Sequence, residues 1–270
     1  MKRCIFAIMA AMLLCGCSIK EEPDTLAVSF FDVGKADSFL MTCGGKNLLM
    51  DAGTAKDGKK VAKRLEDMGV ESIDYLMITH FDRDHAGGAA QIIQDFDVKA
   101  LLRPEYMKES DESAECMAAE DRGVKVIIIT SQTDIQLGST KLVIHPADKV
   151  YENDASNNSS LVTEVFHGNN SLLFTGDIEK ERIADIKYEL NDAGYDFLKV
   201  PHHGRYEKIL PEFFSLVGAQ SAVITSSEKN PEEQKTIQTL EDAGVKDILL
   251  TRGGEITLQS DGRKLDFTQK

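Results

Sequence analysis

The most informative stretch of this sequence is Ile78-Thr79-His80-Phe81-Asp82-Arg83-Asp84-His85-Ala86-Gly87-Gly88. Within six positions it places two imidazoles and two carboxylates, after an apolar run and before two glycines. A strand that stops at His80 can present the residues of the following loop on one side. His80 and Asp82 then suit one cation, and Asp84 and His85 suit a second. The alternative is a charged surface loop, which four potential ligands in so short a stretch disfavour.

The length of the chain admits one sizeable α/β domain or two small ones, since it has 270 residues of which 42% are hydrophobic. No composition break or long linker divides residues 26–270. We therefore expect one domain over 26–270.

Residues 1–17 have the features of a signal peptide. Lys2 and Arg3 form a basic start, and an apolar run too short for a spanning helix follows. The end of the segment, Leu14-Cys15-Gly16-Cys17, resembles the lipobox of bacterial lipoproteins, which implies acylation at Cys17. Residues 18–25 would then be a polar tether that holds the domain at an extracytoplasmic membrane surface. Cys15 is an unusual occupant of its position, so ordinary cleavage and secretion stay the alternative.

The chain is strongly acidic, with a formal net charge of −14. Removing residues 1–16 takes away two positive charges and no negative ones, which changes the net charge to −16. Tight binding to duplex nucleic acid needs clustered Lys and Arg, so we do not expect it. A nuclease is not excluded, because bound cations can cancel several acids. Of the cysteines outside the signal peptide, we expect Cys43 and Cys116 to be thiols rather than a disulfide.

Short apolar segments separated by turns alternate with segments of helical spacing. A mostly polar run at 151–160 predicts a loop. Strands are predicted at 26–31, 38–43, 47–51, 75–78, 98–102, 124–129, 135–137, 141–145, 161–166, 171–175, 197–200, 222–225, 248–251, 255–259 and 265–267. Helices are predicted at 57–68, 88–96, 110–122, 179–191, 211–217 and 232–243. This order fits an α/β fold of two packed sheets with helices outside, although periodicity alone does not separate it from other mixed folds.

Acids or imidazoles follow four of these strands: Asp51, the His80–His85 cluster, Asp177 and the pair His202 and His203. Ligands at the ends of several strands are what a site on one rim of a sheet sandwich needs. The cluster, Thr-Gly-Asp at 175–177 and Pro-His-His-Gly at 201–204, in this order, resemble the metal-binding motifs of the metallo-β-lactamase superfamily. That fold is an αββα sandwich that usually holds two metal ions.

Within the superfamily, the chain is most similar to the metallo-β-lactamase-like domain of ComEC-type competence proteins. Those proteins are implicated in degrading one DNA strand during uptake. The resemblance runs from about Leu26 to the C-terminus, and its motifs lie at 31–38, 79–88, 157–162, 173–179 and 198–204.

The resemblance implies a ligand for each metal position. His80 and Asp82 would hold the first ion, Asp84 and His85 the second, and Asp177 would bridge both. The wider superfamily has His where this chain has Asp82. An oxygen donor makes the site harder, so Mn²⁺ competes with Zn²⁺ for it.

His203 aligns with the last metal-binding His of the superfamily. We favour it over His202, because a residue before Gly at a strand-end turn can point back over the sheet rim. His202 would then donate a proton or contact substrate. His202 and Asp84 are the candidate catalytic residues.

The third metal-binding His of the superfamily has no clear counterpart. His145 and His167 lie between the cluster and Asp177, but outside the position where the motif expects a ligand. A carbonyl oxygen of Asn157 or Asn158, or a water, is the alternative.

Other residues are expected around the metals. Asp51 is interpreted as a carboxylate that accepts the far N–H of a ligand His, the alternative being a solvated acid. The candidates for the substrate side are Asp37, Ser38, Asn158 and Arg205.

The carboxylates of Asp82, Asp84 and Asp177 would converge, which like-charge repulsion forbids unless protons or cations intervene. Two divalent ions would compensate them and assist the in-line hydrolysis of a phosphodiester. Gly87 and Gly88, at a helix start, are expected to leave backbone N–H groups free for an anionic oxygen. This set favours a metal-dependent hydrolase of phosphodiesters, of nucleic acid or small molecules.

The chain also departs from its relatives, at Lys35-Ala36, at Arg205 and at residues 230–235, which lack a His or Tyr. These changes fall on the substrate side and leave two alternatives open. One is hydrolysis of another ester, such as a phosphorylcholine ester or a lactone. The other is a non-catalytic metal-binding lipoprotein that binds a ligand or a competence partner.

Overall fold

The computed structural model describes residues 24–107, 114–191 and 193–270. The predicted signal peptide, 1–17, and all but the last two residues of the predicted tether lie outside these ranges. Within them, no helix combines the length and apolar character that crossing a membrane requires.

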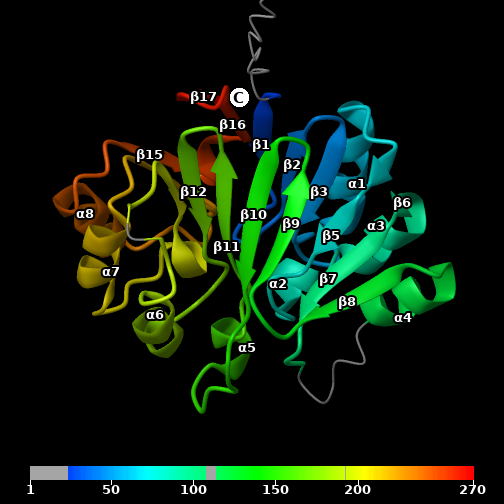
Figure 1. Ribbon diagram of the computed structural model, residues 1–270, viewed down its shortest axis with the longest axis horizontal. Coiled ribbons are helices and arrows are strands. Elements are labelled where there is room, and N and C mark those ends of the chain that lie inside the picture. The colour runs from blue at the N-terminus through cyan, green and yellow to red at the C-terminus, as the bar shows by residue number, and fades with distance from the viewer. Residues whose placement is uncertain (1–23, 108–113, 192) are drawn as a thin grey trace, which may run out of the picture.

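Two large sheets form the centre of the molecule (Figure 1). The first contains β1 (Leu26–Phe30), β2 (Phe39–Cys43), β3 (Lys46–Met50), β5 (Tyr75–Met77), β7 (Ala100–Pro104), β8 (Lys125–Ile129), β16 (Ile256–Ser260) and β17 (Leu265–Gln269). The second contains β9 (Thr133–Leu137), β10 (Thr140–His145), β11 (Val162–His167), β12 (Asn170–Phe174), β13 (Phe197–Lys199), β14 (Ser221–Ile224) and β15 (Asp247–Leu250). Their strand orders are β17-β16-β1-β2-β3-β5-β7-β8 and β15-β14-β13-β12-β11-β10-β9.

Helices cover the outer face of each sheet (Figure 1). The first sheet carries α1 (Gly58–Asp67), α3 (Ala89–Asp95) and α4 (Ala114–Arg122), and the second carries α6 (Lys180–Ile186), α7 (Leu210–Val217) and α8 (Gln234–Asp242). The remaining short elements are α2 (Arg83–Ala86), α5 (Ala155–Asn158), η1 (Pro201–Gly204), η2 (Thr251–Gly253), β4 (Ser72–Ile73) and β6 (Asp97–Val98). This arrangement confirms the predicted αββα sandwich.

An aromatic cluster fills the space between the sheets. The ring centroids of Phe30 and Phe39 are 5.2 Å apart, those of Phe39 and Phe174 5.4 Å, and those of Phe174 and Phe197 5.6 Å. All four side chains are buried, and aromatic pairs at this separation add to the free energy of apolar burial. Separate apolar cores lie between each sheet and its helices, so the two sheets are fixed relative to each other and to both outer layers.

Parallel strands bring the predicted ligands to one edge. In the first sheet β3 pairs parallel with β5, and in the second β12, β13 and β14 run parallel. The carboxyl ends of parallel strands meet at the same edge, which is where ligands bind in such sheets. Asp51 follows β3, His80 follows β5, Asp177 follows β12, and His203 follows β13.

The polar run 151–160, predicted as a loop, contains the one-turn helix α5. This helix is held by tertiary hydrogen bonds rather than by apolar packing. Ser156 Oγ donates to Asp82 Oδ1 at 2.5 Å, and Asn158 Oδ1 accepts from the backbone N–H of Glu179 at 2.9 Å. Hydrophobic periodicity cannot reveal a helix stabilised in this way.

The two remaining cysteines lie in different layers. Cys43 is buried at the end of β2, with its Sγ 3.4 Å from Ser139 Oγ, and Cys116 is in α4. No disulfide joins them within the described residues, as the sequence predicts.

A buried carboxylate on β11, Glu164, is held by three donors. His145 Nε2 lies 2.8 Å from Oε1, while Tyr195 Oη at 2.5 Å and the backbone N–H of Asn191 at 3.2 Å donate to Oε2. Burial raises the pKa of Glu164, but the bonds from His145 and Tyr195 outweigh it and the pKa is lowered. Ionised Glu164 therefore stabilises the fold at neutral pH.

Glu164→Gln should lower the free energy of unfolding at pH 7 by roughly 1–3 kcal/mol, because bonds to a charged acceptor weaken. The pKa in the folded state lies below the ordinary value of 4.5, so this stabilisation is complete above that pH and is lost as the pH falls through the folded-state pKa. Urea unfolding at pH 7 and in acid should show a smaller difference between wild type and variant in acid. Exposed Glu152→Gln is the matched control, and equal losses at both pH values would contradict this account.

Candidate metal centre

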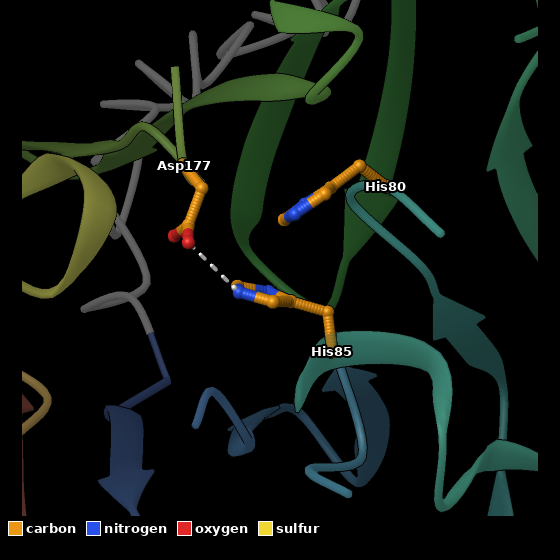
Figure 2. A group of neighbouring side chains, drawn as sticks. All are labelled: His80, His85 and Asp177. Carbon is orange, nitrogen blue, oxygen red and sulfur yellow. Dashed lines mark ion pairs between the residues drawn. The ribbon is translucent and has the colours of Figure 1, made fainter. Parts of the chain in front are cut away.

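His85 is oriented by a buried carboxylate from the end of β3. Asp51 Oδ2 lies 2.7 Å from His85 Nδ1, the contact expected of an orienting acid. Asp51 is itself fixed by the backbone N–H of Thr79 at 2.8 Å and by Thr79 Oγ1 at 2.7 Å. With its Nδ1 engaged, His85 turns its Nε2 toward Asp177, 3.3 Å from Oδ2 (Figure 2).

His80 is oriented by hydroxyl groups. Its Nδ1 lies 3.2 Å from Thr79 Oγ1 and 3.2 Å from Ser160 Oγ. Ser160 Oγ also accepts the backbone N–H of Asp177 at 3.1 Å. One serine therefore ties His80, on the first sheet, to Asp177, on the second. Figure 2 shows His80 and His85, from the segment after β5, facing Asp177 from the segment after β12.

His203 is presented by an unusual turn after β13. His202 and His203 have φ values of 47° and 52°, in the left-handed region that side chains with a Cβ rarely adopt. His203 Nδ1 lies 3.0 Å from Thr225 Oγ1, which donates to Asp37 Oδ1 at 2.5 Å. The opposite nitrogen, Nε2, lies 3.1 Å from Asp177 Oδ2. The turn therefore directs this imidazole back over the rim.

The inward-facing atoms have the character of metal ligands. The Nε2 atoms of His80, His85 and His203 are buried and make no hydrogen bond of acceptable geometry, although those of His85 and His203 approach Asp177 Oδ2 closely. Such unmade bonds are costly in a buried site. Three overlapping sets among the described residues have potential ligand atoms within 4.8 Å of one another: His80 with His85 and Asp177, Asp84 with His85 and His203, and Asp37 with Asp51 and His85. These residues fit divalent metal ions.

The charged groups of this cluster shift one another's pKa values. Burial lowers the pKa of His85 and His203, but the carboxylate of Asp177 outweighs it, and both pKa values are raised. Burial raises the pKa of Asp177, but His203 and His85 hold it well below its usual range. Burial and the neighbouring His85 lower the pKa of His80 to about 3. The raised pKa values of His85 and His203 therefore favour their protonated forms, which compete with cations for the same nitrogens.

The other predicted ligands differ in whether they belong to these sets, and Asp84 belongs to the set with His85 and His203. Asp84 Oδ2 is 3.5 Å from His203 Nε2. Asp82 accepts the Ser156 hydroxyl and belongs to none of these sets, so its role at the first ion stays a prediction. His202 lies outside the sets too, with Nε2 3.9 Å from Asp177 Oδ2. The structure thus brings His203, rather than His202, into the ligand cluster.

The histidines considered for the missing third ligand lie elsewhere. His145 is paired with Glu164 on β11. His167 Nδ1 is 2.7 Å from Ser260 Oγ, and its Nε2 contacts the carbonyl oxygen of Asp24. Both are satisfied within the fold, so neither supplies the third imidazole.

The two asparagines also serve the fold. Asn158 is fully buried, and its Oδ1 accepts the backbone N–H groups of Glu179 and Arg182 at 2.9 and 3.4 Å. It therefore does not face substrate as predicted. Asn157 Nδ2 donates to Glu179 Oε1 at 2.9 Å. The side chain that approaches His80 from this segment is Ser160, which the sequence analysis did not single out.

Three residues predicted on the substrate side differ in exposure. Asp37 and Ser38 are buried at 0% and 1% exposure, so they lie beneath the metal ligands and not on the substrate side. Arg205 has a side chain that is 52% exposed, with Nη1 3.3 Å from Glu179 Oε1. Arg205 is therefore accessible at the margin of the site.

Gly87 and Gly88 do not offer free N–H groups, which corrects that expectation. Gly87 donates to the carbonyl of Arg83 at 3.2 Å, and Gly88 to that of Gly53 at 3.0 Å. A Cβ on Gly88 would lie 2.1 Å from the carbonyl oxygen of Ala52. The two glycines allow the segment that carries His80 and His85 to pack closely against the backbone of residues 52–55.

Lys199, which the sequence analysis also missed, is completely buried below the cluster. Its Nζ forms an ion pair with Asp37 Oδ2 and lies 3.8 Å from Asp177 Oδ1. A lysine inside the otherwise apolar segment 197–200 is the signal that could have revealed it.

Metal affinity should rise with pH, because an imidazole must lose its proton before it can bind a cation. The raised pKa values of His85 and His203 extend this competition above the ordinary value of 6.5. Titration of purified protein with Mn²⁺ or Zn²⁺ between pH 6.5 and 8.5 should show an affinity that rises about tenfold per pH unit for each proton released. A pH-independent affinity would contradict this charge assignment.

Two solved structures share the fold. The metallo-beta-lactamase fold protein YhfI from Bacillus subtilis has a TM-score of 0.57 at 12% identity, over 83% of this chain and 96% of that one. CmlA, a diiron beta-hydroxylase from Streptomyces venezuelae, has a TM-score of 0.55 at 13% identity, over 92% of this chain and 54% of that one. At these identities the likeness concerns the fold alone.

Curated relatives include two bacterial proteins. ComE operon protein 3 of Bacillus subtilis (strain 168) is 28% identical over 205 residues, which are 74% of this chain and 26% of that protein. Recombination protein 2 of Haemophilus influenzae (strain ATCC 51907 / DSM 11121 / KW20 / Rd) is 29% identical over 238 residues, which are 85% of this chain and 28% of that protein. The chain thus spans little more than a quarter of these relatives. They confirm the predicted likeness to ComEC-type competence proteins.

The family assignment rests on most of the described chain. A model of the Metallo-beta-lactamase superfamily matches residues 31–225, well over half of the sequence. That range contains the ligand cluster, Asp177, His203 and the strands that carry them. The chain therefore belongs to the metallo-beta-lactamase superfamily.

Proposed function

We propose that this protein is a metal-dependent hydrolase of phosphodiesters that holds two divalent ions, Mn²⁺ or Zn²⁺. One observation carries the proposal. Three imidazoles, two after β5 and one after β13, have their Nδ1 atoms engaged and their Nε2 atoms directed, without hydrogen bonds, toward the carboxylate of Asp177.

The donor set supports an oxygen-rich metal centre. Asp177 lies between His85 and His203, and Asp84 adds a second carboxylate next to His203. Carboxylates suit harder cations such as Mn²⁺, while imidazole also suits Zn²⁺. Two ions bound here would lower the pKa of a bound water and neutralise charge on a phosphodiester.

Residues of the chain would then position the substrate and handle protons. We assign His202 to contact the substrate or donate a proton, because its imidazole is partly exposed beside the cluster and 3.0 Å from Glu179 Oε1. Arg205 contacts the same Glu179, so an exposed cation stands next to this imidazole. Asp84, partly exposed between His203 and solvent, would remain within reach of a bound substrate.

A groove of about 740 Å³ near this margin supports an extended substrate. Its lining includes three lysines and three acids beside Tyr151 and Ile209, and Lys180 directly follows Glu179. The lysines and acids balance in number, and Lys149 pairs with Asp185 at 2.6 Å, so the groove offers length and apolar surface rather than a net positive charge.

The names of the relatives extend the proposal to nucleic acid. One is called a recombination protein, and another is Competence protein ComA of Neisseria gonorrhoeae, 26% identical over 84% of this chain. We propose single-stranded nucleic acid or a small phosphodiester as substrate. Tight binding of duplex nucleic acid is not proposed, because the chain is acidic.

The hydrolase proposal predicts metal-dependent cleavage by protein lacking residues 1–17. With Mn²⁺ or Zn²⁺ the protein should cleave bis-p-nitrophenyl phosphate or single-stranded DNA, measured by nitrophenol release and by gel. His80→Ala and Asp177→Asn should lower the rate at least about 100-fold, because each removes a metal ligand. Exposed Asp247→Asn is the matched control.

The same assay separates the alternatives. Activity on phosphorylcholine esters or lactones, with none on phosphodiesters, would replace the proposed substrate class. Full activity of both ligand variants would show that the site is misassigned. A wild-type protein that neither binds nor is stabilised by either metal would favour a non-catalytic role.

We also propose that the protein is anchored outside the cytoplasm by lipid on Cys17. The lipobox-like sequence Leu14-Cys15-Gly16-Cys17 supports this. Radioactive palmitate fed to expressing bacteria should label the wild type, and Cys17→Ala should abolish the label and shift the protein from the membrane fraction. Cys43→Ala is the matched control, and unlabelled wild type in the culture medium would indicate secretion instead.

A further inference from the structure

We propose that Lys199 is a positioning residue of this metal centre, which holds the Asp177 carboxylate with Oδ2 toward the metal ligands and Oδ1 away from them. The inference rests on the proposed function, because it takes the cluster to be a metal centre. It adds a role for a residue that is not itself among the predicted metal ligands.

The position of Lys199 is unusual for a lysine. The residue ends β13, and its side chain has 0% exposure. Burying an ammonium group is costly unless it is paired. Its Nζ is paired with Asp37 Oδ2, and it lies 3.8 Å from Asp177 Oδ1. The chain therefore keeps a full positive charge directly beneath the ligand cluster.

The two oxygens of Asp177 face different partners. Oδ2 lies 3.3 Å from His85 Nε2 and 3.1 Å from His203 Nε2, whereas Oδ1 lies on the side of Lys199. The two oxygens of a carboxylate are equivalent, so nothing in the Asp177 side chain itself prevents a rotation that would place both oxygens between the imidazoles. Attraction by Lys199 from one side favours the orientation in which Oδ2 points at the other ligands.

Lys199 differs from the imidazoles in what happens when a cation binds. Protons on His85 and His203 must leave, because those nitrogens become ligands. The ammonium of Lys199 is not a ligand and stays. It therefore holds Asp177 in the same orientation with and without metal, which is the condition for a preorganised site.

Asp37 connects this lysine to a second ligand. Its Oδ2 contacts Lys199, and its Oδ1 accepts from Thr225 Oγ1, which lies 3.0 Å from His203 Nδ1. An Asn at position 37 keeps an oxygen for Thr225. The ion pair can therefore be removed without removing the acceptor that orients His203.

The test is the charge-neutral double variant Lys199→Met/Asp37→Asn, in the full-length chain. Removing both partners leaves no unpaired buried charge and does not change the net charge of the site. A change in metal affinity then reports the position of Asp177. The matched control is Lys141→Met/Asp134→Asn, which removes the exposed ion pair between β9 and β10.

We expect the double variant to unfold, without metal, within a few degrees of the wild type. Calorimetric titration with Mn²⁺ or Zn²⁺ should show at least a tenfold weaker affinity or loss of one of two bound ions, while the control binds like wild type. Wild-type stoichiometry and affinity in the double variant would overturn the proposal.

Two further outcomes are distinguishable. If the Met/Asn variant does not fold, Lys199→Gln/Asp37→Asn, which keeps a polar donor, replaces it in the same titration; weaker binding than wild type supports the proposal and equal binding overturns it. If the wild type itself binds no metal, the proposed function fails, and the role of Lys199 fails with it.

Discussion

The structure depends on concentrating opposite charges at one buried rim. Asp177 is the centre of this arrangement, with His85 and His203 near one oxygen and Lys199 near the other. Charges taken out of water are tolerated only when they are paired and held in good geometry. The fold therefore has to place the ends of several strands with high accuracy, and the αββα layers provide that rigidity.

Each imidazole is oriented by a residue from a different strand end. Asp51 holds His85, Ser160 and Thr79 hold His80, and Thr225 holds His203. These contacts join segments up to 80 residues apart in the chain, as between Ser160 and His80. The aromatic core between the sheets fixes the distance between the two halves of the site. The packing of the sheets thus determines where the strand ends place the imidazoles.

Local sequence signals were enough for much of the fold and part of the site. Apolar periodicity located the strands, and an acid or imidazole directly after a strand pointed to Asp51, Asp177 and His203. Contacts between residues that are distant in the sequence could not be predicted from local signals. The Lys199 ion pair and the Ser160 bridge join residues whose neighbours in sequence give no sign of their partners. Asn158 resembled a site residue but satisfies backbone groups.

The central claim is that Asp177 and three imidazoles hold metal. A crystal structure of protein grown with Mn²⁺, with data collected at the manganese absorption edge, tests it most directly. The account predicts anomalous density among the Nε2 atoms of His80, His85 and His203 and the carboxylate of Asp177. Well-ordered side chains at this rim with no anomalous density between them would contradict it.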